Sequence, residues 1–302
     1  MNSGSAVTRL VVSACCDSEE AAAAVRRALD IPRDAARALG LSAVHASAEG
    51  RHRNGRGEVL DFKSAVDRAV SAKITLPPGA SLPEPVRARM PKMRIGVSNE
   101  TTMTAARRLV DAGHRTLALN FANGVVPGGG FLHGARAQEE TLCRSSALFA
   151  TIEGDPMYAA HRSRSDQASS DWAILSPDVP FFRADDGSPL DRPWLLSVLT
   201  CAAPVAQRTA MGTGEDAVAA LLLCARIHRV LAIAESYRFE ALVLGAWGCG
   251  AFGNDAPRTA RDFREALTGP FLGAFREVVF AIADWSSERR FLGPFRDALA
   301  AG

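Results

Sequence analysis

In the last two-thirds of the chain, short apolar runs alternate with longer segments in which apolar residues recur every three or four positions. Short apolar runs are typical of buried strands, and the longer spacing is typical of helices that cover a sheet. The alternation predicts an α/β fold, with a mixed central sheet between helices. Strands are predicted at 94–98, 115–121, 172–175, 195–201, 241–246 and 277–284, and helices at 101–112, 138–151, 215–237, 256–267 and 287–300.

The first 90 residues have a different pattern. They are rich in alanine with scattered charges, which favours helix. Five prolines follow between positions 77 and 91, a density that forbids regular helix or central strand. The predicted elements are a loose tail at 1–14, a helix at 18–39, a hairpin-type turn at Asn54-Gly55 and a helix at 62–73. We therefore predict a tail and helical extension at 1–90 in front of a main domain at 91–302.

Composition narrows the class of protein. Of the 302 residues, 47% are hydrophobic, and 35 basic against 33 acidic residues leave a net charge of only +2. That balance excludes a strongly cationic protein of the kind that coats nucleic acid, but it permits a local basic site for a phosphorylated ligand. No apolar run approaches the roughly 20 residues that span a bilayer, and residues 10–14 are too short for a signal-peptide core. We therefore expect a cytoplasmic protein without a membrane partner.

The remaining side chains with reactive or ligating groups give no motif of their own. The six cysteines form no CxxC pair, so neither a zinc site nor a disulfide framework is predicted. The histidines share no spacing and are expected at the surface, with His161 part of a small basic patch. Trp285, Phe291 and Phe295 have helical spacing and are expected to lie in the core or to pack against the body of the fold, where Phe291 and Phe295 would anchor the C-terminal segment.

A glycine-rich loop follows the predicted strand at 115–121. It runs from Asn120 to Phe131 and contains three successive glycines, Gly128 to Gly130. Glycines leave no side chain between backbone and ligand, and they allow positive φ angles that let amides converge on an anion. The alternative is a flexible connector. A strand before the loop and a helix after it favour a ligand-binding role.

Three polar residues, Gln138, Glu139 and Glu140, stand where the next helix begins. An acidic first turn is favourable to a helix in any case. The functional alternative is a carboxylate pair that faces a bound sugar. Neighbouring helix residues point about 100° apart, so the pair cannot easily flank one bond from opposite sides, as in ordinary glycosidases. One glutamate would then act as the acid while the other holds ribose hydroxyls.

A second glycine-rich loop, residues 245–254, follows the predicted strand at 241–246. Four glycines beside an aromatic residue suit a loop that wraps a diphosphate. The GxGxxG spacing of Gly248 to Gly253 also occurs in dinucleotide-binding enzymes, but no acidic residue follows about 20 positions later at a strand end. Because ligands of such sheets lie outside the strand carboxyl ends, the two loops are expected to meet at one site.

The first loop and helix, NFANGVVPGGGFLHGARAQEETLCRSS, closely resemble the signature of bacterial-type, or microbial, poly(ADP-ribose) glycohydrolases. That signature is a GGG triplet, a spacer of six to eight residues and QEE. Here the spacer has seven residues, from Phe131 to Ala137. The segment LVLGAWGCGAFGND resembles the second ligand loop of the same family. The resemblance extends over residues 97–295.

The resemblance implies an ADP-ribose-binding macrodomain fold that uses neither metal nor redox cofactor. It implies that Glu140 is the catalytic acid, that Glu139 orients the ribose, and that Glu100 lies near the adenine. The substrate would be poly(ADP-ribose) or ADP-ribosylated protein and the product ADP-ribose, without recognition of nucleic acid sequence. The implied substrate-binding residues are Asn123, Gly128, Gly129, Gly130, Phe131, Gln138, Gly248, Cys249, Gly250, Ala251, Phe252 and Asn254.

Two other functions stay open at this point. One is a reader that binds ADP-ribose without cleaving it, although a diphosphate site gains nothing from two glutamates. The other is a hydrolase of single ADP-ribose units. The resemblance also implies that the C-terminal segment, residues 287–300, closes over the ribose beyond the site, which favours cleavage of terminal units.

Overall fold

The structure is a computed structural model, and it describes residues 8–85, 89–164, 169–206 and 215–300. The helices are α1 (Glu19–Leu29), α2 (Arg33–Glu49), α3 (Lys63–Ser71), α4 (Thr102–Asp111), α5 (Gln138–Ser145), α6 (Leu148–Ile152), α7 (Pro156–Arg162), α8 (Glu215–Ser236), α9 (Ala256–Thr268) and α10 (Leu292–Ala300), with a 3-10 turn, η1, at Phe131–His133. The strands are β1 (Arg9–Val12), β2 (Arg51–Arg53), β3 (Val59–Asp61), β4 (Ile74–Leu76), β5 (Lys92–Ser98), β6 (Thr116–Phe121), β7 (Ala173–Arg183), β8 (Pro189–Cys201), β9 (Ala241–Leu244) and β10 (Glu277–Ala281).

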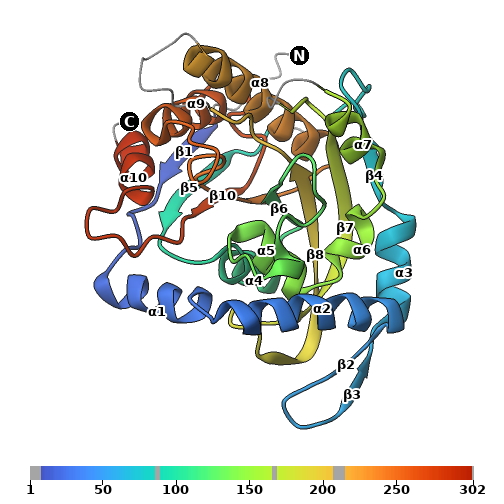
Figure 1. The fold of residues 1–302 in the computed structure, drawn as a ribbon. Coiled ribbons are helices and arrows are strands. Elements are labelled where there is room, and N and C mark those ends of the chain that lie inside the picture. Colours follow the sequence, from blue (N-terminus) through green and yellow to red (C-terminus); the bar gives the residue numbers. More distant parts are fainter. Residues whose placement is uncertain (1–7, 86–88, 165–168, 207–214, 301–302) are drawn as a thin grey trace.

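The fold is built on one eight-stranded sheet with the order β1-β5-β10-β9-β6-β8-β7-β4 (Figure 1). The first six strands in that order, from β1 at the edge to β8, run parallel to one another. Strand β7 is antiparallel to both of its neighbours, β8 and β4. The two strands that precede the glycine-rich loops, β6 and β9, are adjacent at the centre. Both the mixed sheet and the central place of these strands are as predicted. Their following loops leave the same edge of the sheet.

Alternation along the central strands divides the core into two layers. Leu117 and Leu119 of β6 face the layer of α8, α9 and α10, whereas Ala118 between them faces the layer of α2 to α7. Strand β10 does the same, with Phe280 in the first layer and Val279 in the second. Side chains of successive strand residues point to opposite faces, so these nearly continuous apolar runs fit a sheet that helices cover on both sides.

The first 90 residues are joined to the sheet more closely than their composition suggests. The predicted loose tail at 1–14 is wrong for its described part, because β1 pairs in parallel with β5 at one edge. Strand β4 closes the other edge on β7. The predicted hairpin is confirmed as β2 and β3, and the helix at 18–39 is divided into α1 and α2 around Pro32. The division of the chain at residue 90 stays a prediction.

Several predicted elements have different bounds in the structure. The helix at 138–151 is interrupted at Ser146, whose extended backbone bridges to Phe181. The C-terminal helix begins at Leu292 rather than 287, because the Asp284 carboxylate accepts the backbone N–H groups of Phe291 and Leu292. Strands β7 and β8 are longer than predicted, since they continue past a register shift after Ser176.

One described helix has the composition of a membrane span. Residues 217–236 of α8 have a mean hydropathy of 1.9 and sufficient length, contrary to the expectation that no such run occurs. In the fold, Leu223, Ile227 and Val230 of this helix are buried in the core. Arg226 from the same helix donates to the carbonyl of Ala202. Burial in the core accounts for part of the apolar composition of α8, whereas Val218 and Leu221 of the same helix are exposed.

Candidate active site

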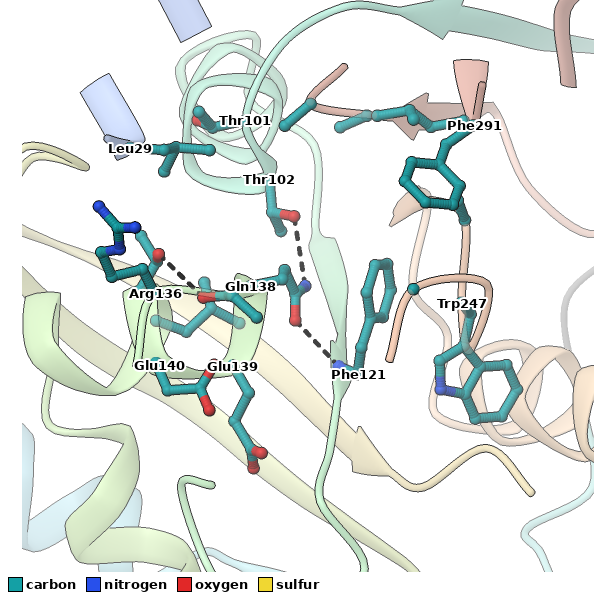
Figure 2. Close-up of a pocket in the computed structure, with 18 of the residues that line it drawn as sticks. Leu29, Thr101, Thr102, Phe121, Arg136, Gln138, Glu139, Glu140, Trp247 and Phe291 are labelled. Atoms are coloured by element: carbon teal, nitrogen blue, oxygen red, sulfur yellow. Dashed lines mark hydrogen bonds between the residues drawn. The ribbon is translucent and has the colours of Figure 1, made fainter. Parts of the chain in front are cut away.

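A cavity of about 410 Å³ opens at the sheet edge where the two glycine-rich loops meet. This volume lies in the range of small-molecule sites. Figure 2 shows Glu139, Glu140 and Gln138 on one side and Trp247 and Phe291 on the other, with Phe121 between them. Both loops contribute to the lining, through Asn123 of the first and Gly248, Gly250, Ala251 and Phe252 of the second. The predicted meeting of the loops is confirmed.

Glu139 is the more deeply placed of the two carboxylates, with 3% of its surface exposed. Its Oε2 accepts the backbone N–H of Asn123 at 2.7 Å, and its Oε1 lies 3.4 Å from the side-chain amide of Asn120. Burial raises the pKa of Glu139 to about 8, and the neighbouring charge of Glu140 adds to that effect. The hydrogen bonds from Asn123 and Asn120 act in the opposite direction. At neutral pH, Glu139 therefore holds a proton in the free protein.

Glu140 lies beside the cavity and is anchored through one oxygen. Its Oε1 accepts the backbone N–H of Gly130 at 2.9 Å. Glu140 lines the cavity and is 9% exposed. The two glutamates extend from the first turn of α5 with their carboxylates close together (Figure 2). They do not flank a space between them, which agrees with the expectation from their adjacent positions on one helix.

The glycine triplet makes this arrangement sterically possible. Gly129 has φ +57°, and a Cβ at this position would come within 2.4 Å of Glu140 Oε1 and 3.0 Å of Glu139 Oε2. Only glycine accepts both the backbone conformation and the contact. The triplet therefore supports the carboxylates from behind, and none of its three residues lines the cavity.

Gln138 joins the start of α5 to the end of β6. Its Nε2 donates to the carbonyl of Leu119 at 2.7 Å and to Thr102 Oγ1 at 3.2 Å, while its Oε1 accepts the N–H of Phe121 at 2.9 Å. Figure 2 shows the bonds to Thr102 and Phe121. The side chain lines the cavity, but its polar atoms are used to fix α5 against the sheet.

The second loop brings backbone rather than polar side chains to the cavity. Gly250, Ala251 and Phe252 line it, and their N–H groups donate to no acceptor in the described part of the chain. Gly248 has φ +76°, and a Cβ there would come within 2.6 Å of the Asn254 side chain. Unpaired amides that converge at a cavity are typical of phosphate-binding loops.

Six predicted substrate-binding residues do not line the cavity: the three glycines of the triplet, and Phe131, Cys249 and Asn254. Phe131 is 1% exposed and packs in the core, with its ring 4.9 Å from that of Phe149. Cys249 is buried and does not line the cavity. Asn254 uses its amide to hold the carbonyls of Pro204 and Gly248. The side chains of Phe131, Cys249 and Asn254 shape the two loops, and their contact with substrate stays a prediction.

Several cavity residues were not predicted. Thr101 and Asp185 lie at the start of α4 and in the turn after β7, and Leu29 reaches the cavity from α1. Trp285 and Phe291 line the cavity, whereas only Phe295 of that aromatic group is in the core. These positions come from distant parts of the chain, and their sequence carries no motif. Glu100 also lines the cavity, where Arg108 pairs with it at 2.6 Å.

His161 also differs from its predicted surface position. It is 3% exposed, and its Nδ1 lies 2.8 Å from the carbonyl of Gly124. Arg162 beside it donates to the carbonyl of Val125 at 2.9 Å. The small basic segment therefore supports the first glycine-rich loop. Among the described residues, no three His, Cys, Asp or Glu side chains are grouped so that they could hold a metal ion.

Comparison with known proteins gives consistent matches. Residues 42–184 match the family described as microbial-type PARG, catalytic domain. The poly(ADP-ribose) glycohydrolase of Thermomonospora curvata is 36% identical over 88% of this chain and 99% of that chain, with a TM-score of 0.79. Its structure with the inhibitor ADP-HPD gives 37% identity over 87% and 99%, with the same TM-score.

A second solved structure adds a bound product-like ligand. The poly(ADP-ribose) glycohydrolase of Deinococcus radiodurans in complex with ADP-ribose is 42% identical over 69% of this chain and 85% of that chain, with a TM-score of 0.65. The search of curated proteins gave no match.

Proposed function

The chain belongs to the family of microbial-type poly(ADP-ribose) glycohydrolases and is a glycosyl hydrolase, and we propose that Glu140 is the acid with which it cleaves ribose–ribose bonds. The observation that carries this assignment is the pair of adjacent carboxylates at one cavity, each held by a backbone N–H of the first glycine-rich loop. A site that only binds a diphosphate gains nothing from two such groups, because they repel it.

The proposed roles of the two glutamates follow from how each is held. Both oxygens of Glu139 accept hydrogen bonds, so this side chain is fixed and suited to orienting a ribose. Glu140 uses only Oε1 for its anchor at Gly130, and its other oxygen accepts no hydrogen bond from the residues that the structure describes. We therefore assign the proton transfer to Glu140, in agreement with the family resemblance.

The proposed reaction begins with protonated Glu140 in the substrate complex. Bound substrate covers the remaining exposed surface of Glu140 and brings a diphosphate near it, and both effects favour the neutral acid. Glu140 donates its proton to the leaving ribose oxygen as the anomeric carbon gains oxocarbenium character. The resulting carboxylate then accepts a proton from the attacking water. The cycle leaves ADP-ribose and a polymer shorter by one unit.

The binding half of the proposal rests on the second loop. The N–H groups of Gly250, Ala251 and Phe252 supply donors for a diphosphate without a metal ion, and Phe252 supplies an apolar wall for the distal ribose. On the other side of the cavity, Trp285 and Phe291 border the space beyond that ribose. Their position supports the proposal that terminal units are the preferred substrate.

The assignment is tested by incubating the protein with labelled poly(ADP-ribose) and, separately, with a protein that carries single ADP-ribose units. We expect release of ADP-ribose from the polymer. Binding of polymer without release would favour the reader, and release only from the singly modified protein would favour a mono-ADP-ribosyl hydrolase. None of the residues that the structure describes favours either alternative over the glycohydrolase.

A further inference from the structure

The active-site cavity extends past the two glutamates to the junction of α1 and α2. Leu29, the last residue of α1, lines the cavity together with Arg136, which stands four residues before Glu140. Figure 2 shows Leu29 and Arg136 on one side of Gln138, and Trp247 on the other. The cavity therefore has two ends, one at the second glycine-rich loop and one at the α1–α2 junction, with the first turn of α5 between them.

The guanidinium group of Arg136 is held through one of its nitrogens. Nη1 donates to Asp30 Oδ1 at 2.8 Å and to the carbonyl of Ile31 at 2.7 Å. Nε and Nη2 donate to no acceptor in the described part of the chain, and 43% of the side chain is exposed. Because a guanidinium carries five N–H donors in a fixed plane, Arg136 has donors left for an anion in the cavity.

The α1–α2 junction also has an excess of positive charge. Residues 26–34 contain three arginines and two aspartates, and Arg136 adds a fourth arginine. One of these arginines, Arg33, donates to the carbonyl of His133 at 3.0 Å, so the junction is fastened to the segment that leads into α5. The second glycine-rich loop, in contrast, brings backbone N–H groups and apolar side chains to the cavity. The two ends of the cavity therefore suit two different parts of a ligand.

We propose that Arg136 binds the diphosphate of the polymer unit that leaves during cleavage, an assignment that rests on the proposed function. In that function, the second glycine-rich loop holds the diphosphate of the terminal unit, and Glu140 donates its proton to the oxygen that joins this unit to the next. The next unit extends from that oxygen away from the second loop, where Leu29 and Arg136 form the cavity wall. Its diphosphate matches the guanidinium, since charge-assisted hydrogen bonds between arginine and phosphate are strong and directional.

This assignment gives the N-terminal helices a part in substrate selection. Leu29 lines the cavity, and Asp30 and Ile31 hold Arg136 in place. A substrate with a second ADP-ribose unit gains a contact at this end of the cavity, whereas a single unit on a protein side chain does not. The junction of α1 and α2 therefore favours polymer over singly modified protein.

The test compares how tightly full-length Glu140→Gln protein, which is expected to cleave slowly, binds ADP-ribose and a dimer of ADP-ribose. The dimer reaches both ends of the cavity, and ADP-ribose reaches one. Calorimetry should show the dimer binding about three- to tenfold more tightly, the gain expected of a charge-assisted hydrogen bond at a partly exposed site. Adding Arg136→Gln should abolish this preference and leave the affinity for ADP-ribose within about twofold. Adding Asp30→Asn instead should increase the preference, because Arg136 loses its counter-charge but keeps its bond to Ile31.

The matched control is Arg26→Gln. The Arg26 side chain pairs with the same carboxylate, with its Nε 3.7 Å from Asp30 Oδ2, but it does not line the cavity. Arg26→Gln should therefore leave both affinities unchanged. In an otherwise wild-type protein, Arg136→Gln should raise KM for poly(ADP-ribose) about three- to tenfold and keep kcat within about threefold.

A purely structural role for Arg136 predicts that ADP-ribose and the dimer lose affinity equally. Equal losses, or a dimer preference that survives Arg136→Gln, would overturn the proposal. If Arg136→Gln does not fold, Asp30→Asn decides, and an unchanged or smaller dimer preference would overturn the proposal. A wild-type protein that binds the dimer and never cleaves it would overturn the proposed function instead, and the two affinities would still show whether Arg136 binds the second unit.

Discussion

Replacing Gly129 by alanine perturbs the active site through a single methyl group. The new Cβ would lie 2.4 Å from Glu140 Oε1, whereas ordinary contacts begin at 3.4 Å, so the carboxylate must move by about 1 Å. A displacement of that size can cost about 10²-fold in rate. It also weakens the hydrogen bond from Gly130 to Glu140, which holds the proposed acid in place. We expect kcat of Gly129→Ala on poly(ADP-ribose) to fall about 100-fold or more.

The control for this variant is Gly154→Ala. Gly154 has φ +70°, close to the +57° of Gly129, but a Cβ there meets nothing within 4 Å. Both variants therefore carry the left-handed backbone cost of about 1–2 kcal/mol, and only Gly129→Ala disturbs a carboxylate. We expect Gly154→Ala to lower the free energy of unfolding by that amount and to leave kcat unchanged.

A double variant separates the clash from the backbone cost. In a Glu140→Ala background the methyl group of Gly129→Ala keeps only the 3.0 Å approach to Glu139 Oε2, so the substitution should cost less in urea unfolding than it does when Glu140 is present. ADP-ribose binding by Gly129→Ala, measured by calorimetry, should stay within about tenfold, because the second loop is untouched. A folded Gly129→Ala protein with wild-type turnover would show that Glu140 does not need its present position.

The remaining predictions concern pH, metals and product. Because the pKa of Glu139 is raised to about 8, the folded state keeps a proton that the unfolded state loses above its ordinary pKa of 4.5, so wild-type stability falls between pH 4.5 and 8. Glu139→Gln removes this dependence. In urea unfolding, the free energy of unfolding of Glu139→Gln relative to that of wild type should therefore rise by roughly 3–5 kcal/mol from pH 5 to pH 8. The same difference between the two proteins at both pH values would contradict the burial argument. ADP-ribose should bind with the same affinity with and without excess chelator in calorimetry, because backbone N–H groups are proposed to hold the diphosphate. Loss of binding on chelation would show that binding depends on a metal ion. Early reaction products separated by chromatography should be mainly free ADP-ribose, because Trp285 and Phe291 line the cavity where we propose that the terminal ribose ends. Abundant oligomers at short times would contradict this prediction.

The sheet and the position of the site were predictable because they depend on local patterns. The run at 241–246 is apolar throughout and the run at 115–121 has the apolar residues Leu117, Ala118, Leu119 and Phe121, a composition typical of strands buried on both faces, and each run is followed by glycines. The site then follows from a general property of parallel sheets, since loops after adjacent strands share an edge.

The parts that were not predictable depend on contacts between distant residues. Strand β1 is a short run with partly exposed side chains, and only its pairing with β5 makes it a strand. Phe131 stands next to three functional glycines, yet its ring enters the core, where α2 approaches so closely that Gly40 faces its carbonyl. Asp185 and Trp285 reach the cavity from turns whose sequences carry no motif. No local periodicity could have placed these residues.

The measurement that tests the central claim most directly is the turnover of Glu140→Gln on poly(ADP-ribose), alongside its affinity for ADP-ribose. Glutamine keeps the shape of the side chain and its bond to Gly130 but has no proton to transfer. Positioned acid–base groups contribute about 10²–10⁴-fold, so hydrolysis should fall at least that far, with ADP-ribose binding within about tenfold and with Glu49→Gln, at an exposed carboxylate, as active as wild type. A folded Glu140→Gln protein that turns over polymer at the wild-type rate would contradict the account.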